Sequence, residues 1–185
     1  MGWNTGVDAS SAAVLGAAVG ALGGLGGGVV AAAGQARQQR RQHDRERQRW
    51  RDEVRRAAYG GILTATKQLS NALWKAADQL AQRDAGPAEW QARHEDVHNA
   101  WTQFSAAVAD VGVAGPQNVV DAAEDLRHVM YDWEMICTAW THTAIREGSG
   151  HVGDFADRFK AAAGAKRAPD RAFQVAARRA LGTND

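Results

Sequence analysis

The sequence contains one cysteine and three prolines in 185 residues. The single thiol, Cys137, cannot form a disulfide within the chain, and its apolar surroundings are typical of a small buried residue. The β-branched and aromatic clusters that mark strands are also missing, whereas Ala, Arg, Gln and Leu, which favour helices, are abundant. The composition therefore predicts an all-α fold.

Sequence motifs for nucleotide or acyl-transfer chemistry are absent as well. The chain has no phosphate-binding loop, no nucleophile elbow and no strand-embedded dinucleotide fingerprint. Its length leaves room for one ordinary domain and an appendage, which excludes a multi-domain enzyme.

Charge of one sign is concentrated in one short region. Residues 35–56 hold nine Arg against four acidic residues, whereas residues 57–185 hold 13 basic against 16 acidic residues. This pattern predicts three parts: a glycine-rich N-terminal helix at 1–34, an Arg-rich helical stalk at 35–56 and a helical domain at 57–185.

The N-terminal segment predicts a single transmembrane helix. No residue from Ala9 to Gly34 is charged, and at about 1.5 Å per residue this helix exceeds the roughly 30 Å of a bilayer core. Because basic residues follow the segment and none precedes it, we expect a single-pass protein of the cell membrane, with its N-terminus outside and its C-terminal domain in the cytoplasm. A signal peptide cleaved near 31–33 is the alternative, but its basic N-terminal region is missing.

Small residues recur every four positions in this segment, at Gly16, Gly20, Gly24 and Gly28. Such a stripe lets a second helix approach closely, so it predicts a homo-oligomer that associates through these glycines. Several such helices around a lumen would instead form a pore, which is an alternative function.

The composition of the Arg-rich stalk predicts a solvent-exposed helix next to the predicted transmembrane span. Its first two turns place Arg37, Arg40 and Arg41 where they can contact the headgroups of an anionic inner leaflet. Nucleic-acid binding is not expected, because Trp50 is the one aromatic residue among these basic residues.

Three heptad-like stripes follow and predict an antiparallel bundle of three to four helices. Breaks are expected at 84–87 and 112–116, where Gly and Pro gather. Intervals of three and four residues define each stripe. The first contains Ile62, Thr66, Leu69, Leu73, Ala76 and Leu80, the second Trp90, His94, Val97, Trp101, Phe104, Val108 and Val111, and the third Val119, Ala123, Leu126, Met130, Trp133, Cys137, Trp140 and Ala144. Two shorter elements, with Phe155 and Phe159 and with Phe173, Ala176 and Leu181, are expected to close the fourth side.

One segment resembles a catalytic motif. Residues 94–98 match H-E-x-x-H, which on a helix places His94 and His98 on one face with Glu95 beside them, an arrangement that can bind zinc and supply a general base. Zinc peptidases usually carry an apolar residue in the third position, and this chain has an acidic one. Glu124 or Glu134 could be the third ligand, and the sequence does not choose between them.

The chain resembles small uncharacterised membrane-anchored helical proteins of actinobacteria. The resemblance rests on the Gly/Ala-rich segment, on QQRR at 38–41, on RRAAYGGIL at 55–63 and on AARRALG at 176–182. It implies the same anchored helical layout and carries no activity.

These observations favour a non-enzymatic, membrane-tethered scaffold or adaptor. It would self-associate through its glycine-rich helix, bind an unknown protein partner with its bundle and need no cofactor. The pore and an H-E-x-x-H zinc hydrolase are the alternatives.

Overall fold

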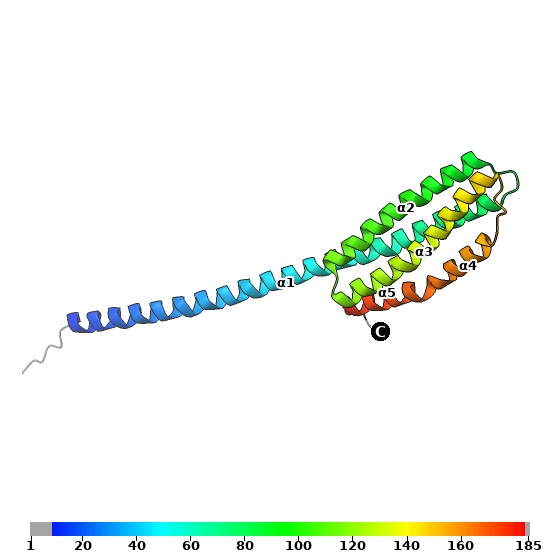
Figure 1. Cartoon of the computed structure of the whole chain (residues 1–185). Helices are drawn as coiled ribbons and strands as arrows, with labels where there is room; N and C mark the ends of the chain where they lie inside the picture. The colour runs from blue at the N-terminus through cyan, green and yellow to red at the C-terminus, as the bar shows by residue number, and fades with distance from the viewer. Residues whose placement is uncertain (1–8, 184–185) are drawn as a thin grey trace, which may run out of the picture. The chain divides into compact units, whose positions relative to one another are not determined.

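Five α-helices make up the computed structural model, which describes the backbone of residues 9–183 and the side chains of residues 42–183 (Figure 1). No strand occurs in this part of the chain, so the all-α prediction is confirmed. The helices are α1 (Ala9–Ala81), α2 (Pro87–Ala114), α3 (Gln117–Glu147), α4 (Phe155–Ala165) and α5 (Arg167–Ala180).

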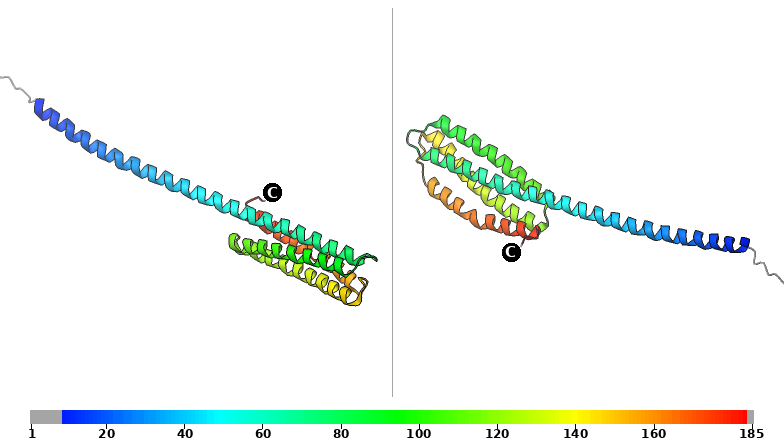
Figure 2. Two further views of the ribbon diagram at one scale, coloured as in Figure 1. Left: turned by 90° about the horizontal axis from the view of Figure 1, so that it is seen from above. Right: turned by 180° about the vertical axis from the view of Figure 1, so that it is seen from behind.

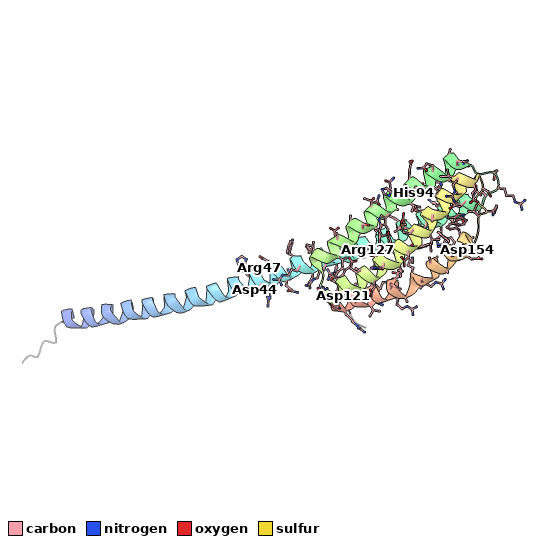
Figure 3. All side chains as sticks on the ribbon, viewed as in Figure 1. Asp44, Arg47, His94, Asp121, Arg127 and Asp154 are labelled. Atoms are coloured by element: carbon pink, nitrogen blue, oxygen red, sulfur yellow. The ribbon has the colours of Figure 1, made fainter. Side chains whose placement is uncertain are left out.

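The chain divides into two units, Met1–Trp50 and Arg51–Asp185. In the first unit, the side chains of residues 42–50, among them Asp44 and Arg47, are all exposed (Figure 3). The second unit holds the remainder of α1 together with α2 to α5, and every site described below belongs to it.

The predicted fold class was wrong in its transmembrane part. Among the described residues, no helix is long and apolar enough to cross a membrane. Each described helix of the bundle has one apolar face and carries charged residues on its other faces, which lowers the mean hydropathy of any long window. The side chains of the predicted span itself, residues 9–34, lie outside the described part of the chain. The segments predicted as span, stalk and first bundle helix belong to one backbone helix, α1, in agreement with the absence of a predicted break before residue 84.

The bundle is antiparallel, as predicted. Arg55, near the start of the bundle part of α1, donates a hydrogen bond to the carbonyl of Ala114 at the end of α2 (3.1 Å). At the opposite end, the indole N–H of Trp90 donates to the carbonyl of Gln79 (3.3 Å). The bundle has four sides, formed by α1 from residue 51 onward, by α2, by α3 and by the α4–α5 pair. These sides lie next to one another in all three views (Figures 1 and 2).

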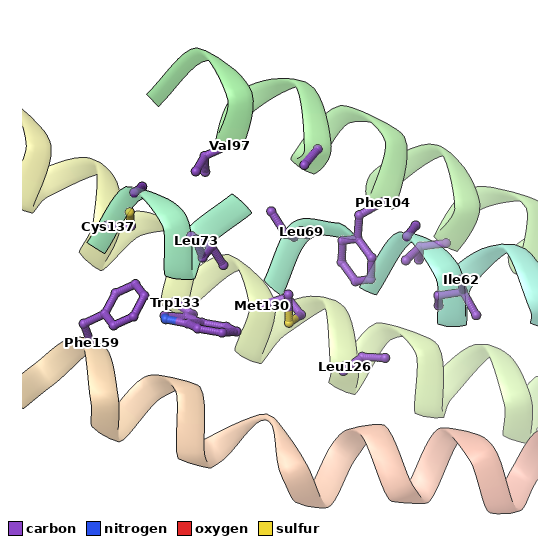
Figure 4. Packing of buried hydrophobic residues seen from close by; sticks show 14 of the residues in the cluster. Ile62, Leu69, Leu73, Val97, Phe104, Leu126, Met130, Trp133, Cys137 and Phe159 are labelled. Atoms are coloured by element: carbon purple, nitrogen blue, oxygen red, sulfur yellow. The ribbon is translucent and has the colours of Figure 1, made fainter. Parts of the chain in front are cut away.

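The core consists of the predicted stripes (Figure 4). The largest fully buried side chains are Trp133, Phe104, Phe159, Phe173, Ile62, Leu69, Leu73, Leu80, Leu126, Met130, Val97 and Val111. Trp101, expected in the core, is only partly buried and packs against its edge. Aromatic contacts join the sides, such as Tyr59 of α1 with Phe173 of α5 at 6.2 Å between ring centroids.

Residues at the helix ends determine where the helices are interrupted. The carboxylate of Glu89 accepts a hydrogen bond from the N–H of Gly86 (2.8 Å), and Pro87 occupies the first turn of α2, where its missing N–H costs nothing. Pro169 lies in the first turn of α5 and cannot donate to the carbonyl four residues earlier. The α4–α5 side is therefore interrupted at Lys166 instead of being one helix.

Candidate functional site

A groove of about 740 Å³ runs along the outer face of α5. Three guanidinium groups border it, those of Arg167, Arg171 and Arg179, and Asn118 from the start of α3 forms part of its wall. Its apolar lining comes from small side chains of α5, namely Ala168, Ala172, Val175 and Ala176.

The sequence of α5 places these residues there because of the helical period. Phe173 and Ala177 are buried and fix the inner face of α5 against the core. Residues 167, 171, 175 and 179 follow one another at intervals of four, so they form a stripe on another face. All three arginines of the stripe are exposed, and Val175 is half-buried. The groove thus has a row of cations around an apolar strip.

The arginines of the groove lack acidic partners within the described residues. Arg127 is paired with Glu124 (2.6 Å), and Arg158 lies 3.7 Å from Asp154. No such ion pair involves Arg167, Arg171 or Arg179 in the described part of the chain.

Charge around the groove is locally positive although the bundle is not. Residues 166–179 carry five basic residues and one acidic residue, Asp170. The whole of 57–185 has more acidic than basic residues. Unpaired guanidinium groups offer forked donors that match carboxylate and phosphate oxygens, so the groove suits an anionic segment with a small apolar face.

The H-E-x-x-H motif lies on α2, where His94 and His98 are one turn apart as predicted. The ring centroid of His94 is 5.2 Å from that of His142 on α3, and the carboxylate of Glu134, also on α3, is near enough to act on the His94 ring electrostatically. Burial lowers the pKa of His94 below its ordinary 6.5, and His142 lowers that pKa further. These effects favour a neutral ring.

Neither predicted third ligand completes a zinc site. Glu124 is held by Arg127 on the surface, and the buried Glu134 accepts a hydrogen bond from Thr138 (2.9 Å). Within the described residues, no group of three or more His, Cys, Asp or Glu side chains could hold a metal ion. The geometry does not select the motif as the functional site.

Two predicted sets of site residues lie outside the described side chains. The oligomerisation stripe Gly16, Gly20, Gly24 and Gly28 and the headgroup-contact set Arg37, Arg40 and Arg41 belong to the part of α1 before residue 42. Both assignments stay predictions.

Sequence reasoning missed the α5 groove, although a signal was present. Arg167, Arg171, Val175 and Arg179 recur at the helical interval, and the segment is the most basic part of 57–185. The interval alone predicts a shared face. It does not show whether acidic residues of other helices neutralise that face, which depends on how the helices pack.

No family model, no curated protein and no solved structure matches this chain.

Proposed function

We propose that this protein is a non-enzymatic helical adaptor whose bundle binds an acidic amphipathic segment of a partner protein in the α5 groove. The observation that carries the proposal is the row of three exposed arginines without acidic partners among the described residues, placed around an apolar strip. A partner helix with carboxylates flanking small apolar residues complements both features.

A protein segment fits the groove better than other polyanions do. Single-stranded nucleic acids are usually bound by basic grooves with aromatic stacking platforms, and no aromatic side chain lines this groove. A flat anionic membrane would meet the acidic remainder of the bundle, since residues 57–185 have more acidic than basic residues. An acidic segment can enter the groove without approaching those residues.

The non-enzymatic part of the proposal draws support from the described chemistry. Cys137 is buried, and burial together with nearby Glu134 raises its pKa to about 12, so it is a poor nucleophile. His94 is in ring contact with His142, and burial lowers its pKa.

The test uses the full chain and a fluorescent synthetic peptide that alternates Glu with Ala and Leu at helical spacing. We expect saturable binding by fluorescence anisotropy that weakens as salt rises. The Arg171→Glu/Arg179→Glu double variant should bind at least tenfold more weakly.

Lys67→Glu/Lys75→Glu is the matched control. It reverses two exposed cations of α1, also eight residues apart, and so changes the net charge equally. Its affinity for the peptide should be unchanged. If both double variants bind the peptide equally weakly, net charge alone explains the loss of affinity and the groove does not. If the protein binds duplex DNA or anionic phosphatidylserine vesicles more tightly than the peptide, a protein partner is rejected.

Photo-crosslinking from the α5 groove can identify partner proteins in cells. A photo-crosslinking amino acid in place of Val175 should give a discrete protein adduct, whereas the same group at Gln91, exposed on α2, should not. The adduct should disappear when Arg171 and Arg179 are reversed. An adduct that persists in the reversed protein would contradict the proposed groove.

Self-association through the glycine stripe is a separate part of the proposal, and it comes from the sequence. Replacing Gly20 and Gly24 with Ile should convert an oligomer to a monomer by light scattering while leaving the helix content of the bundle intact. An oligomer of unchanged size would reject it without affecting the groove.

A further inference from the structure

A second cavity, of about 430 Å³, lies where α1, α3 and the α4–α5 junction meet. It is smaller than the α5 groove and lies within the size range of pockets that take small ligands. Arg167 borders both spaces, and the other lining residues of the two differ. The pocket can therefore be tested separately from the groove.

Two indoles form the apolar wall of this pocket. Trp74 of α1 and Trp133 of α3 are in an edge-to-face contact, with ring centroids 6.1 Å apart and an angle of 75° between planes. Trp74 is unusual for a tryptophan of the bundle, because 42% of it is exposed. Gly164 of α4 also lines the pocket, and a Cβ placed on it would meet no atom within 4 Å. A larger side chain at position 164 would therefore have room.

The indole N–H of Trp133 is buried and has no hydrogen-bond acceptor among the described residues. Most buried donors in folded proteins are paired, and an unpaired one costs free energy. Trp90 and Trp140 both satisfy their N–H groups with backbone carbonyls. Trp133 instead lies beside the ring of Phe159, at 5.3 Å between centroids (Figure 4), which offers at most a weak interaction.

Cationic side chains predominate among the charged residues that line the pocket. Lys160, Lys166 and Arg167 line it together with one acidic residue, Asp170. The ammonium group of Lys166 is positioned by a hydrogen bond to the hydroxyl of Ser70 (3.0 Å). The carboxylate of Asp170 is engaged with the amide of Gln174 (3.0 Å). The balance of charge at the pocket is positive.

We infer that this pocket binds a small amphipathic anion, namely a carboxylate, sulfonate or phosphate monoester attached to an aromatic or aliphatic body. The body packs against Trp74 and Trp133, and the anionic group lies among Lys160, Lys166 and Arg167. This site goes beyond the proposed adaptor function and does not depend on it.

The probe is 8-anilinonaphthalene-1-sulfonate, an aromatic sulfonate, titrated into the folded full-length protein. We expect one saturable site with enhanced probe fluorescence. Gly164→Leu should weaken binding at least tenfold, because the new side chain fills the open space. Gly112→Leu is the matched control, since Gly112 is another helical glycine with open space around it and lies away from the pocket. It should bind the probe as the parent does.

Two further arms test the chemistry of the site. The uncharged probe N-phenyl-1-naphthylamine should bind at least tenfold more weakly than the sulfonate, and equal binding would reject an anion site. Trp74→Ala should weaken sulfonate binding several-fold because it removes the exposed part of the indole wall, and unchanged binding would reject the role of that wall. A loss of probe binding in Arg171→Glu/Arg179→Glu but not in Gly164→Leu would place the probe in the α5 groove and overturn the inference. Native near-UV circular dichroism of each variant excludes binding to unfolded protein.

Discussion

The indole N–H of Trp140 donates a buried hydrogen bond of 2.8 Å to the carbonyl of Gly150. This bond ties the last turns of α3 to the loop before α4. Gly150 lies so close to the end of α1 that a Cβ on it would collide with the carbonyl oxygen of Leu80. The loop around Gly150 therefore contacts both α1 and α3 and connects them to α4.

Gly150→Ala should destabilise the bundle. The added methyl group has no space beside the backbone of Leu80, and such overpacking costs about 1–3 kcal/mol. The free energy of unfolding from urea denaturation is the measurement. Gly112→Ala is the control, because its Cβ meets nothing within 4 Å and helix propensity should raise stability by up to about 1 kcal/mol. A Gly150→Ala protein as stable as the parent would show that Leu80 moves freely.

Trp133→Phe and Trp140→Phe should differ in stability although both remove the same atoms from the core. The Trp140→Phe substitution removes a hydrogen bond and leaves the carbonyl of Gly150 without this donor. The Trp133→Phe substitution removes an N–H that has no acceptor among the described residues. We expect Trp140→Phe to be less stable than Trp133→Phe by about 1–3 kcal/mol. Urea denaturation of the two variants side by side measures the difference. Equal losses would mean that Trp133 has an acceptor in solution.

Acidification should weaken the fold through His94. Burial, then His142, lower its pKa in the folded state below 6.5, against the smaller opposing effect of Glu134. The unfolded chain thus binds the proton more tightly, so this contribution to stability is complete above about pH 6.5 and is lost as the pH falls from there through the folded pKa.

His94→Gln removes this titration and keeps a polar side chain at the position. The free energy of unfolding of the variant should fall less between pH 7.5 and pH 5.5 than that of the parent. Parallel pH profiles would assign the acid sensitivity to other groups.

The thiol of Cys137 should be unreactive in the folded protein. It is buried, and its pKa of about 12 leaves almost no thiolate at pH 8. A disulfide reagent such as 5,5′-dithiobis(2-nitrobenzoic acid) should label it only at the rate of unfolding, and should label one thiol per chain at once in guanidinium chloride. Rapid labelling of the native protein would show that α3 opens locally.

Much of the bundle was predictable because its signals are local. The alternating intervals of three and four residues from Ile62 to Leu80 predicted a buried face, and these residues are buried. The helix breaks at 84–87 and 112–116 followed from Gly and Pro, whose backbone chemistry acts within a few residues.

The transmembrane part of the predicted fold class was wrong. The H-E-x-x-H motif shows what a sequence motif cannot predict about contacts between helices. Its spacing correctly placed His94 and His98 on one helix. The spacing could not show that His94 faces His142, because that contact depends on how α2 and α3 pack. A motif specifies the geometry along one helix, whereas a metal site also needs ligands from neighbours.

The all-α class, the helix limits of the bundle and its core stripes were determined by the sequence itself, since propensity, periodicity and turn residues act over short stretches of chain. The α5 groove, the missing acceptor of Trp133 and the pocket at Lys166 were decided only by the tertiary structure. Whether a charge is paired, a donor satisfied or a space filled depends on residues distant in sequence, such as Ser70 and Lys166, that packing brings together.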